Sequence, residues 1–327
     1  MNCGNVGDLL VNEATFNDQK AAHLQTTIKS LVTFEGVGLH SGKPVCITLH
    51  PADANTGVVF RRSDVAGGDI AALWNNVEQT ALNTRLVGAD GTCVGTIEHL
   101  MAALAGTGVH NVLVEIDGPE VPIMDGSASV FVRGIVKTGV IQLAAPLFAI
   151  EILREISVQN GDAEASLTPA TSLQIDFAIA FEDEAIGSQH KTLNMANGTF
   201  VRELCDSRTF CRNSDVAMMH ENGLALGGSL KNAVVVDGSE VLTPGGLRHA
   251  DEAVRHKMLD ALGDLYTAGA PILGRYTGQR AGHALTNKLL RALFAQPDAW
   301  RLVPCDANIA ARLPGVGVTS ADLIAVA

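Results

Sequence analysis

The sequence predicts an α+β protein of two related domains, each a β-sheet layered with helices on one side. Short β-branched segments alternate with a few helical stretches along the 327 residues. The order strands, helix, glycine, strand, loop, helix occurs twice along the chain. A length of this size also agrees with about two domains. Helices packed on the apolar face of each sheet would provide its buried side.

The first domain is expected over residues 26–145, after a loose extension at residues 1–25. Its strands are predicted where short β-branched runs lie between glycine or proline residues. Its first helix carries apolar residues at helical spacing, Thr96 can cap the start, and glycines follow the end. The predicted strands are 45–49, 58–61 and 111–116, and the predicted helices are 96–105 and 127–137.

The second domain is expected over residues 146–304, and residues 305–327 form a C-terminal tail. Its pattern repeats that of the first domain, with strand-like runs before and between two helical stretches. The predicted strands are 148–153, 173–181 and 272–275, and the predicted helices are 251–268 and 283–294.

Composition excludes several classes of function. The net charge is −12, with no long basic run, which argues against general binding of nucleic acid or of an anionic membrane surface. No apolar run approaches the ~20 residues of a membrane span, and the start does not resemble a secretory signal. The six cysteines form no C-x-x-C pair, which is typical of free thiols in a reducing compartment. We therefore expect a cytoplasmic protein, and a monomer.

The run from Val254 to Asp264 carries the first candidate ligands. At about 100° per residue, His256, Asp260 and Asp264 fall within about 80° of one another on a helix, and apolar residues cluster on the roughly opposite side. Two ligand-type side chains four residues apart can reach one metal ion. The alternative is a solvated helix face, and the motif alone favours that alternative.

Glu98 and His99 lie in the other amphipathic helix. Neighbouring side chains diverge by about 100° on a helix, so one can bind a metal while the other reaches a water on that metal. Surface polarity is again the alternative. Together the two helices supply His99, His256 and Asp260 with a spare Glu98, which matches a catalytic zinc site with three protein ligands and one open position.

Seven stretches, in order along residues 26–304, resemble the UDP-3-O-acyl-N-acetylglucosamine deacetylases, the zinc amidases of lipid A synthesis. The extension and the tail lie outside the resemblance. The matching stretches are 36–42 (GVGLHSG), 96–104 (TIEHLMAAL), 122–127 (PIMDGS), 207–210 (SRTF), 226–229 (LGGS), 256–260 (HKMLD) and 282–285 (GHAL).

The resemblance implies hydrolysis of the acetamide of UDP-3-O-acyl-N-acetylglucosamine to acetate and the free amine, the committed step of lipid A biosynthesis. It implies an active site at the domain interface. One zinc ion per chain, or iron(II) in cells, would be held by His99, His256 and Asp260. Zinc would polarise the amide carbonyl and acidify its bound water.

The resemblance also implies the roles of four further residues. Glu98 would take the proton from water, and the hydroxyl of Thr209 would help to stabilise the oxyanion. His283, paired with Asp264, would protonate the departing amine or stabilise the same intermediate as a cation. Without the resemblance, the run around His283 reads as a helix start with a chance histidine.

Four residues are implied in substrate binding. Lys257 would contact a phosphate, Phe210 and Gly228 belong to matching motifs, and Arg280 stands where the family can carry Lys. Residues 211–236 resemble an inserted βαβ element that encloses the acyl chain, although apolar residues there also suit plain core.

One departure and two competing functions remain. Asp183-Glu184 stands where the family often carries His-Pro, which affects the sugar-side pocket and not the zinc chemistry. His40 is interpreted as structural, although it lies in a matching motif. A peptidase or cyclic amidase could use the same ligands, and activity on a nucleotide-sugar amide would separate them. A metal that only braces the interface is disfavoured, because bracing needs no spare Glu98 or His283.

Overall fold

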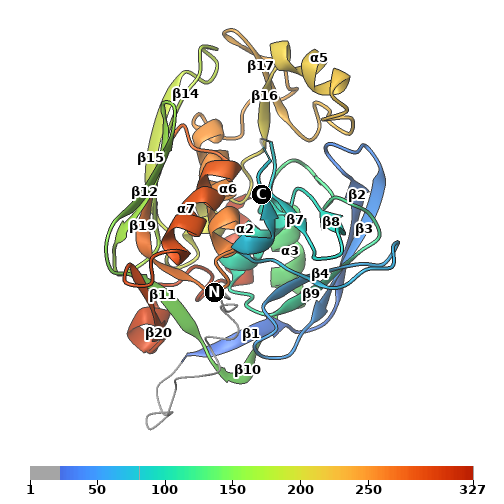
Figure 1. Ribbon diagram of the computed structural model, residues 1–327. Coiled ribbons are helices and arrows are strands. Elements are labelled where there is room, and N and C mark those ends of the chain that lie inside the picture. The colour runs from blue at the N-terminus through green and yellow to red at the C-terminus, as the bar shows by residue number, and fades with distance from the viewer. Residues whose placement is uncertain (1–22, 81, 327) are drawn as a thin grey trace.

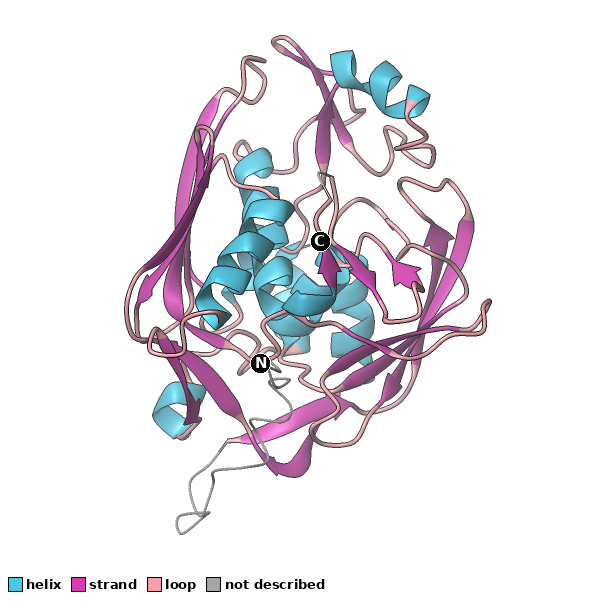
Figure 2. Cartoon of the chain, in the orientation of Figure 1, coloured by secondary structure: helices cyan, strands magenta, loops and turns pink. Residues whose placement is uncertain are grey.

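Two β-sheets enclose a layer of helices (Figure 1). The structure, a computed structural model, describes residues 23–80 and 82–326. Within those residues, one sheet has the strand order β2-β3-β9-β4-β5, and the other has the order β12-β13-β19-β11-β20, with β14 and β15 attached through β19. The helices α2, α3, α6 and α7 lie between the sheets (Figure 2). The predicted α+β class is confirmed.

The first sheet belongs to the N-terminal half. Its strands are β2 (Val32–Val37), β3 (Pro44–Pro51), β4 (Val58–Arg62), β5 (Ile70–Ala71) and β9 (Val112–Ile116). In β3 every second residue is buried, among them Ile47 and Leu49, because alternate side chains face the helices. A smaller sheet consists of β6 (Val77–Glu78), β7 (Arg85–Val87) and β8 (Cys93–Val94), after the short helix η1 (Trp74–Asn76).

The second sheet repeats part of the first. Its strands are β11 (Phe148–Ile152), β12 (Ile156–Asn160), β13 (Ala163–Pro169), β14 (Gln174–Ala180), β15 (Ser188–Asn194), β19 (Ile272–Gln279) and β20 (Trp300–Pro304). β19 pairs antiparallel with β13 and parallel with β14, just as β9 pairs antiparallel with β3 and parallel with β4. The twofold order of elements in the sequence thus corresponds to a repeated three-strand unit.

The four central helices are α2 (Glu98–Thr107), α3 (Ser129–Thr138), α6 (Glu252–Tyr266) and α7 (His283–Phe294), each ending within two residues of its predicted bounds. The shorter helices are α4 (Thr199–Glu203), α8 (Ala307–Ala310) and η2 (Ser320–Val326). At one end of the molecule β1 (Leu24–Ile28) pairs with β10 (Val140–Pro146). At the other end β16 (Phe210–Arg212), α5 (Asn213–Glu221), β17 (Val234–Asp237) and β18 (Glu240–Val241) form a separate unit (Figure 1).

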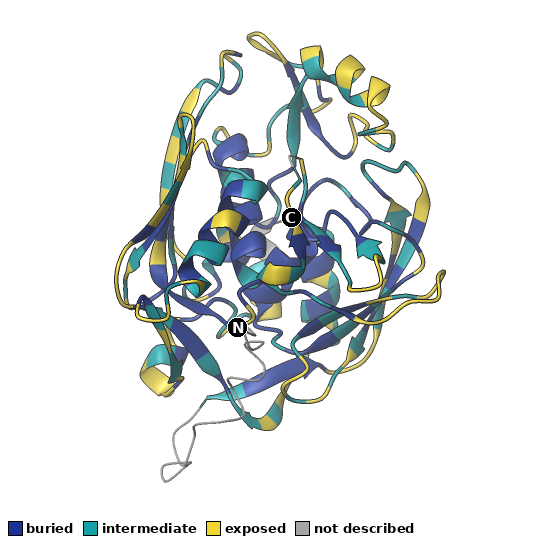
Figure 3. Cartoon of the chain, in the orientation of Figure 1, coloured by how far each residue is buried: buried dark blue, intermediate teal, exposed yellow. Residues whose placement is uncertain are grey.

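Two predictions about the first helix are wrong. It is not amphipathic, because all ten residues of α2 are buried between the two halves (Figure 3). Thr96 does not cap it: the helix begins at Glu98, and the Thr96 hydroxyl donates to Glu120 Oε1 at 2.8 Å. Thr96 adopts a left-handed φ of 54° and lies two residues before the helix, and Ile97 occupies the N-cap position without a side-chain cap.

The solvated face, which was the alternative for the second helix, is absent. His256, Asp260 and Asp264 are all buried. They face α2 and α7 rather than water, because α6 passes through the middle of the molecule (Figure 3).

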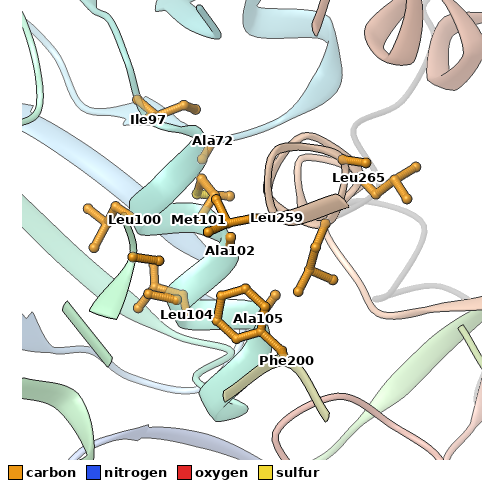
Figure 4. Close-up of a cluster of buried hydrophobic side chains, with 14 of the residues drawn as sticks. Ala72, Ile97, Leu100, Met101, Ala102, Leu104, Ala105, Phe200, Leu259 and Leu265 are labelled. Atoms are coloured by element: carbon orange, nitrogen blue, oxygen red, sulfur yellow. The ribbon is translucent and has the colours of Figure 1, made fainter. Parts of the chain in front are cut away.

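The helices α2 and α6 pack with their backbones in contact. A Cβ on Gly263 would stand 2.0 Å from the carbonyl oxygen of Glu98 and 3.1 Å from the amide nitrogen of Ala102. Apolar side chains of both helices close the crossing on its sides, as Figure 4 shows for Met101 of α2 and Leu259 of α6. Only glycine permits this approach.

The structure describes the predicted N-terminal extension only from residue 23, and it describes most of the predicted C-terminal tail. Most of the extension lies outside the described residues, and Leu24 already belongs to β1. In the tail, Cys305 and Leu313 are buried in a small apolar cluster, and Asp322 pairs with Arg202 at 2.7 Å. No helix among the described residues is long and apolar enough to cross a membrane. The domain boundaries stay predictions.

Replacing Gly263 by Ala tests the helix crossing. The new methyl group would overlap the Glu98 carbonyl, so the helices must separate, and overpacking of this kind costs about 1–3 kcal/mol or more. Urea unfolding measures the loss. Gly68→Ala is the matched control, because the nearest atom to its Cβ would be 4.0 Å away. Equal stability of the two variants would contradict the close packing.

Candidate active site

Three predicted ligands from two helices meet at one buried point. The Nε2 atoms of His99 and His256 lie 3.5 and 3.4 Å from Asp260 Oδ1, and the three ligand atoms all lie within 4.8 Å of one another. His99 comes from α2 and the other two from α6, so the helix crossing assembles the set. The predicted i, i+4 arrangement of His256 and Asp260 is therefore present in space as well as in sequence.

The chemistry of these atoms suits a bound cation. His256 Nδ1 donates to the carbonyl oxygen of Ser207 at 3.0 Å, so its Nε2 presents a lone pair to the cluster. Asp260 Oδ1 is buried with no hydrogen-bond partner among the described residues. Burial lowers the pKa of His256 to about 4, which keeps the ring neutral, as a metal ligand must be. The residues present thus fit a metal ion.

Lys257 contacts the ligand set. Its Nζ donates to Asp260 Oδ2 at 3.1 Å, so this bond engages the oxygen that does not face the two imidazoles. Burial alone would raise the pKa of Asp260, but the charges of His256 and Lys257 outweigh burial and hold the pKa well below its ordinary value. Lys257 lies beside the cluster with a partly accessible side chain, rather than on a solvated face.

Glu98 and His283, for which the family resemblance implied the roles of base and acid, also lie close to this point. Glu98 Oε1 and Asp260 Oδ2 each lie 4.0 Å from His283 Nε2. His283 Nδ1 faces Asp264 Oδ2 at 2.9 Å, so the pair that the family resemblance implied is in contact. His283 begins α7, which packs against α6, and Asp264 lies one turn beyond Asp260 on α6. Three helices therefore supply the whole cluster.

Burial and charge shift the pKa values of Glu98 and His283. Burial raises the pKa of Glu98, which favours its capacity to accept a proton near neutral pH. Burial alone would lower the pKa of His283, but Asp264 and Glu98 overcome it and raise the pKa to about 9. A carboxylate acceptor and an imidazolium donor can thus coexist here.

A buried ion pair holds the loop that carries Thr209. Glu252 Oε1, at the start of α6, accepts from both the amide and the Nε of Arg208 at 2.9 Å. Thr209 follows directly, and its amide donates to the carbonyl oxygen of Gly126 at 2.8 Å. The ring of Phe210 lies 6.3 Å from that of His256 at an interplanar angle of 81°. The loop is therefore fixed to both halves beside the ligand set.

An apolar cavity of about 380 Å³ opens beside this loop. Its wall includes Thr209, Phe210 and Gly228, together with Leu39 from the first half. The unit of β16, α5 and β17 encloses it, and β16 and β17 run parallel as a βαβ element requires. The structure thus has a βαβ unit where the sequence predicted one, with an apolar hollow beneath it.

The pair Gly227-Gly228, and two further residues discussed in the sequence analysis, Asp183 and Arg280, lie outside the ligand set. A Cβ on Gly227 would stand 2.3 Å from the carbonyl oxygen of Gly38, so the pair serves a close loop contact. Asp183 is one of the two residues that stand where the family often carries His-Pro. Its carboxylate accepts a hydrogen bond from Arg212 of β16 and so ties the unit to the second sheet. Arg280 is exposed directly after β19, and its guanidinium lies 4.0 Å from Asp162.

Sequence reasoning missed one residue that touches the cluster. Thr84 donates its amide to Glu98 Oε2 at 2.9 Å and its hydroxyl to Asp264 Oδ1 at 2.5 Å. It lies in the loop before β7, within a polar run that has no chemical signature of its own. Only the tertiary packing brings it to the site.

Comparison with known proteins identifies the family of this chain. A family model described as UDP-3-O-acyl N-acetylglycosamine deacetylase matches residues 25–295. A UDP-3-O-acyl-N-acetylglucosamine deacetylase of Phenylobacterium zucineum is 50% identical over 85% of this chain and 96% of that protein. Proteins of the same name from Shewanella piezotolerans and Shewanella violacea are 44% and 46% identical, over 90% and 85% of this chain and 98% and 92% of theirs. The chain belongs to the UDP-3-O-acyl N-acetylglycosamine deacetylase family.

Proposed function

We propose that this protein hydrolyses the acetamide of UDP-3-O-acyl-N-acetylglucosamine, releasing acetate and the free amine in lipid A biosynthesis. One observation carries the proposal: the ligand atoms of His99, His256 and Asp260 meet at a point that Glu98 and His283 also face. The family and its relatives' names support the choice of substrate. A peptidase with the same ligands would not need an apolar cavity that a βαβ unit encloses.

The proton acceptor is Glu98. An amide is a weak electrophile, and water at neutral pH is a weak nucleophile, so the attacking water must lose a proton. Oε2 of Glu98 is engaged by the Thr84 amide, which leaves Oε1 to accept that proton. The buried setting keeps the carboxylate basic enough for this task.

The proton donor is His283. The amine of the sugar leaves only after protonation, and the Nε2 edge of this ring faces the cluster while Nδ1 faces Asp264. Asp264 keeps the ring cationic and fixes its orientation. The Thr209 hydroxyl, at the wall beside the ligand set, would donate to the oxyanion of the attacked carbonyl.

The rest of the substrate has two places to bind. The apolar cavity beside Thr209 would take the acyl chain, since it is lined mainly by apolar side chains. Lys257, already beside Asp260, would contact a phosphate of the nucleotide. Zinc is the proposed ion, held by two imidazoles and one carboxylate, and it would supply Lewis-acid activation of the carbonyl and of water. Iron(II) in cells, a monomeric state and a cytoplasmic location stay predictions.

His256→Ala should remove both the metal and the activity, because two remaining protein ligands hold zinc poorly. Zinc per chain is measured by atomic emission, and acetate release by a coupled assay. His190→Ala is the control, because this histidine pairs with Asp176 on an exposed part of the second sheet. Full zinc occupancy in His256→Ala would overturn the ligand assignment.

Glu98→Gln should keep the metal and lose activity by roughly 10²–10⁴, the range of a lost general base. Glutamine has nearly the size of glutamate and can still accept from the Thr84 amide, but it cannot take a proton from water. Glu164→Gln, at an exposed position of β13, is the control. Wild-type turnover by Glu98→Gln with full metal would reopen the view that the metal only braces the interface.

Asp264→Asn should shift the basic limb of the pH profile of kcat/KM to lower pH. The reaction needs the protonated form of His283, so the rate falls as pH rises through the pKa of that ring. The charge of Asp264 raises this pKa, so its removal lowers the pKa and moves the limb down. Asp298→Asn removes a charge from an exposed pair and should leave the limb in place. An unmoved limb in Asp264→Asn would exclude the coupling.

A further inference from the structure

Thr84 is a buried residue whose polar groups all contact the active-site region. Its carbonyl oxygen accepts from the amide of Ile97 at 3.2 Å, just before α2. Its amide donates to Glu98 Oε2 at 2.9 Å, and its hydroxyl donates to Asp264 Oδ1 at 2.5 Å. One residue of the loop before β7 therefore bonds to two helices at the same time. It does not line the apolar cavity.

The two bonds from Thr84 orient two carboxylates. A carboxylate on a flexible side chain can rotate, and a hydrogen bond to one oxygen fixes where the other points. With Oε2 held by Thr84, Glu98 directs Oε1 to within 4.0 Å of His283 Nε2. With Oδ1 held by the hydroxyl, Asp264 directs Oδ2 to His283 Nδ1 at 2.9 Å.

We propose that Thr84 is a positioning residue that aligns the proton acceptor and the proton donor with each other. It acts through Glu98 by its amide and through Asp264 by its hydroxyl, and it does not touch the substrate. The inference rests on the proposed deacetylase function, since it assigns Thr84 a part in the same reaction. A purely structural threonine would affect stability and leave turnover unchanged.

The hydroxyl is tested with Thr84→Val and Thr84→Ser. Valine has the same shape and keeps the amide, so only the bond to Asp264 is lost. Hydrogen bonds to charged groups are worth enough that we expect kcat to fall roughly 10- to 100-fold, with KM within about twofold of wild type. Serine keeps the hydroxyl, and Thr84→Ser should restore most of kcat. Unchanged kcat in Thr84→Val, or no recovery in Thr84→Ser, would overturn the proposal.

A double-mutant cycle identifies the partner through which the hydroxyl acts. In an Asp264→Ala background the acceptor is absent, so adding Thr84→Val should change kcat by less than about twofold. A full additional loss in that background would show that the hydroxyl acts elsewhere and would overturn the route through Asp264. Metal content is measured in every variant and should equal that of wild type.

Two further variants and the wild-type activity separate a loss of stability from a loss of catalysis. Thr107→Val is the matched control: this threonine is also buried, and its hydroxyl donates to the Ala103 carbonyl at the far end of α2, so stability falls and kcat does not. If Thr84→Val does not fold, Thr84→Cys replaces it, because a thiol of similar size is a weak donor. Absence of deacetylation by the wild type would refute the proposed function itself, whereas an active wild type with an equally active Thr84→Val refutes only the role of Thr84.

Discussion

The contact between Gly263 and the backbone of α2 is the constraint on which the rest of the site depends. Because no side chain separates the helices here, Glu98 and His99 on one helix stand beside the ligands of the other. The two halves of the chain each supply an incomplete set, and neither could hold the cluster by itself. The candidate metal site is therefore a property of the interface, and its geometry is as rigid as the packing of two buried helices allows.

Burial of the charged side chains between the helices also determines which of them need a partner. Charged groups taken out of water are costly unless each has a partner, and most groups of this cluster have one. Asp264 has the Thr84 hydroxyl and His283, and one oxygen of Asp260 has Lys257. The oxygen of Asp260 that faces two imidazoles lacks a donor, and this single imbalance is what a cation would remove. Structural stability and metal binding are thus coupled at one carboxylate.

The periodicity of apolar residues was enough to predict the helices. The spacing of His256 and Asp260 placed them on one helix face, but only the second helix and the family resemblance made them ligands. Two things could not follow from local pattern. Burial of α2 on every side depends on what packs against it, so its polar residues looked like a surface. The contacts of Thr84 join residues 14 and 180 positions away, and no short motif records such a distance. Resemblance to a family supplied the role of Thr209, and it supplied a role for His283, which the sequence alone left as a chance histidine.

The candidate site has two parts that differ in how tightly they are packed into the molecule. The proposed reacting groups lie on α2, α6 and α7, whose packing leaves little freedom, whereas the apolar cavity depends on a unit whose helix α5 has no buried residue. That unit is joined to the body by the Arg212–Asp183 pair and by the close contact of Gly227 with Gly38. Changes on α5 can therefore alter the shape of the cavity without moving the ligand set. Asp183 belongs to this attachment, whereas the ligand atoms of His99, His256 and Asp260 lie on α2 and α6.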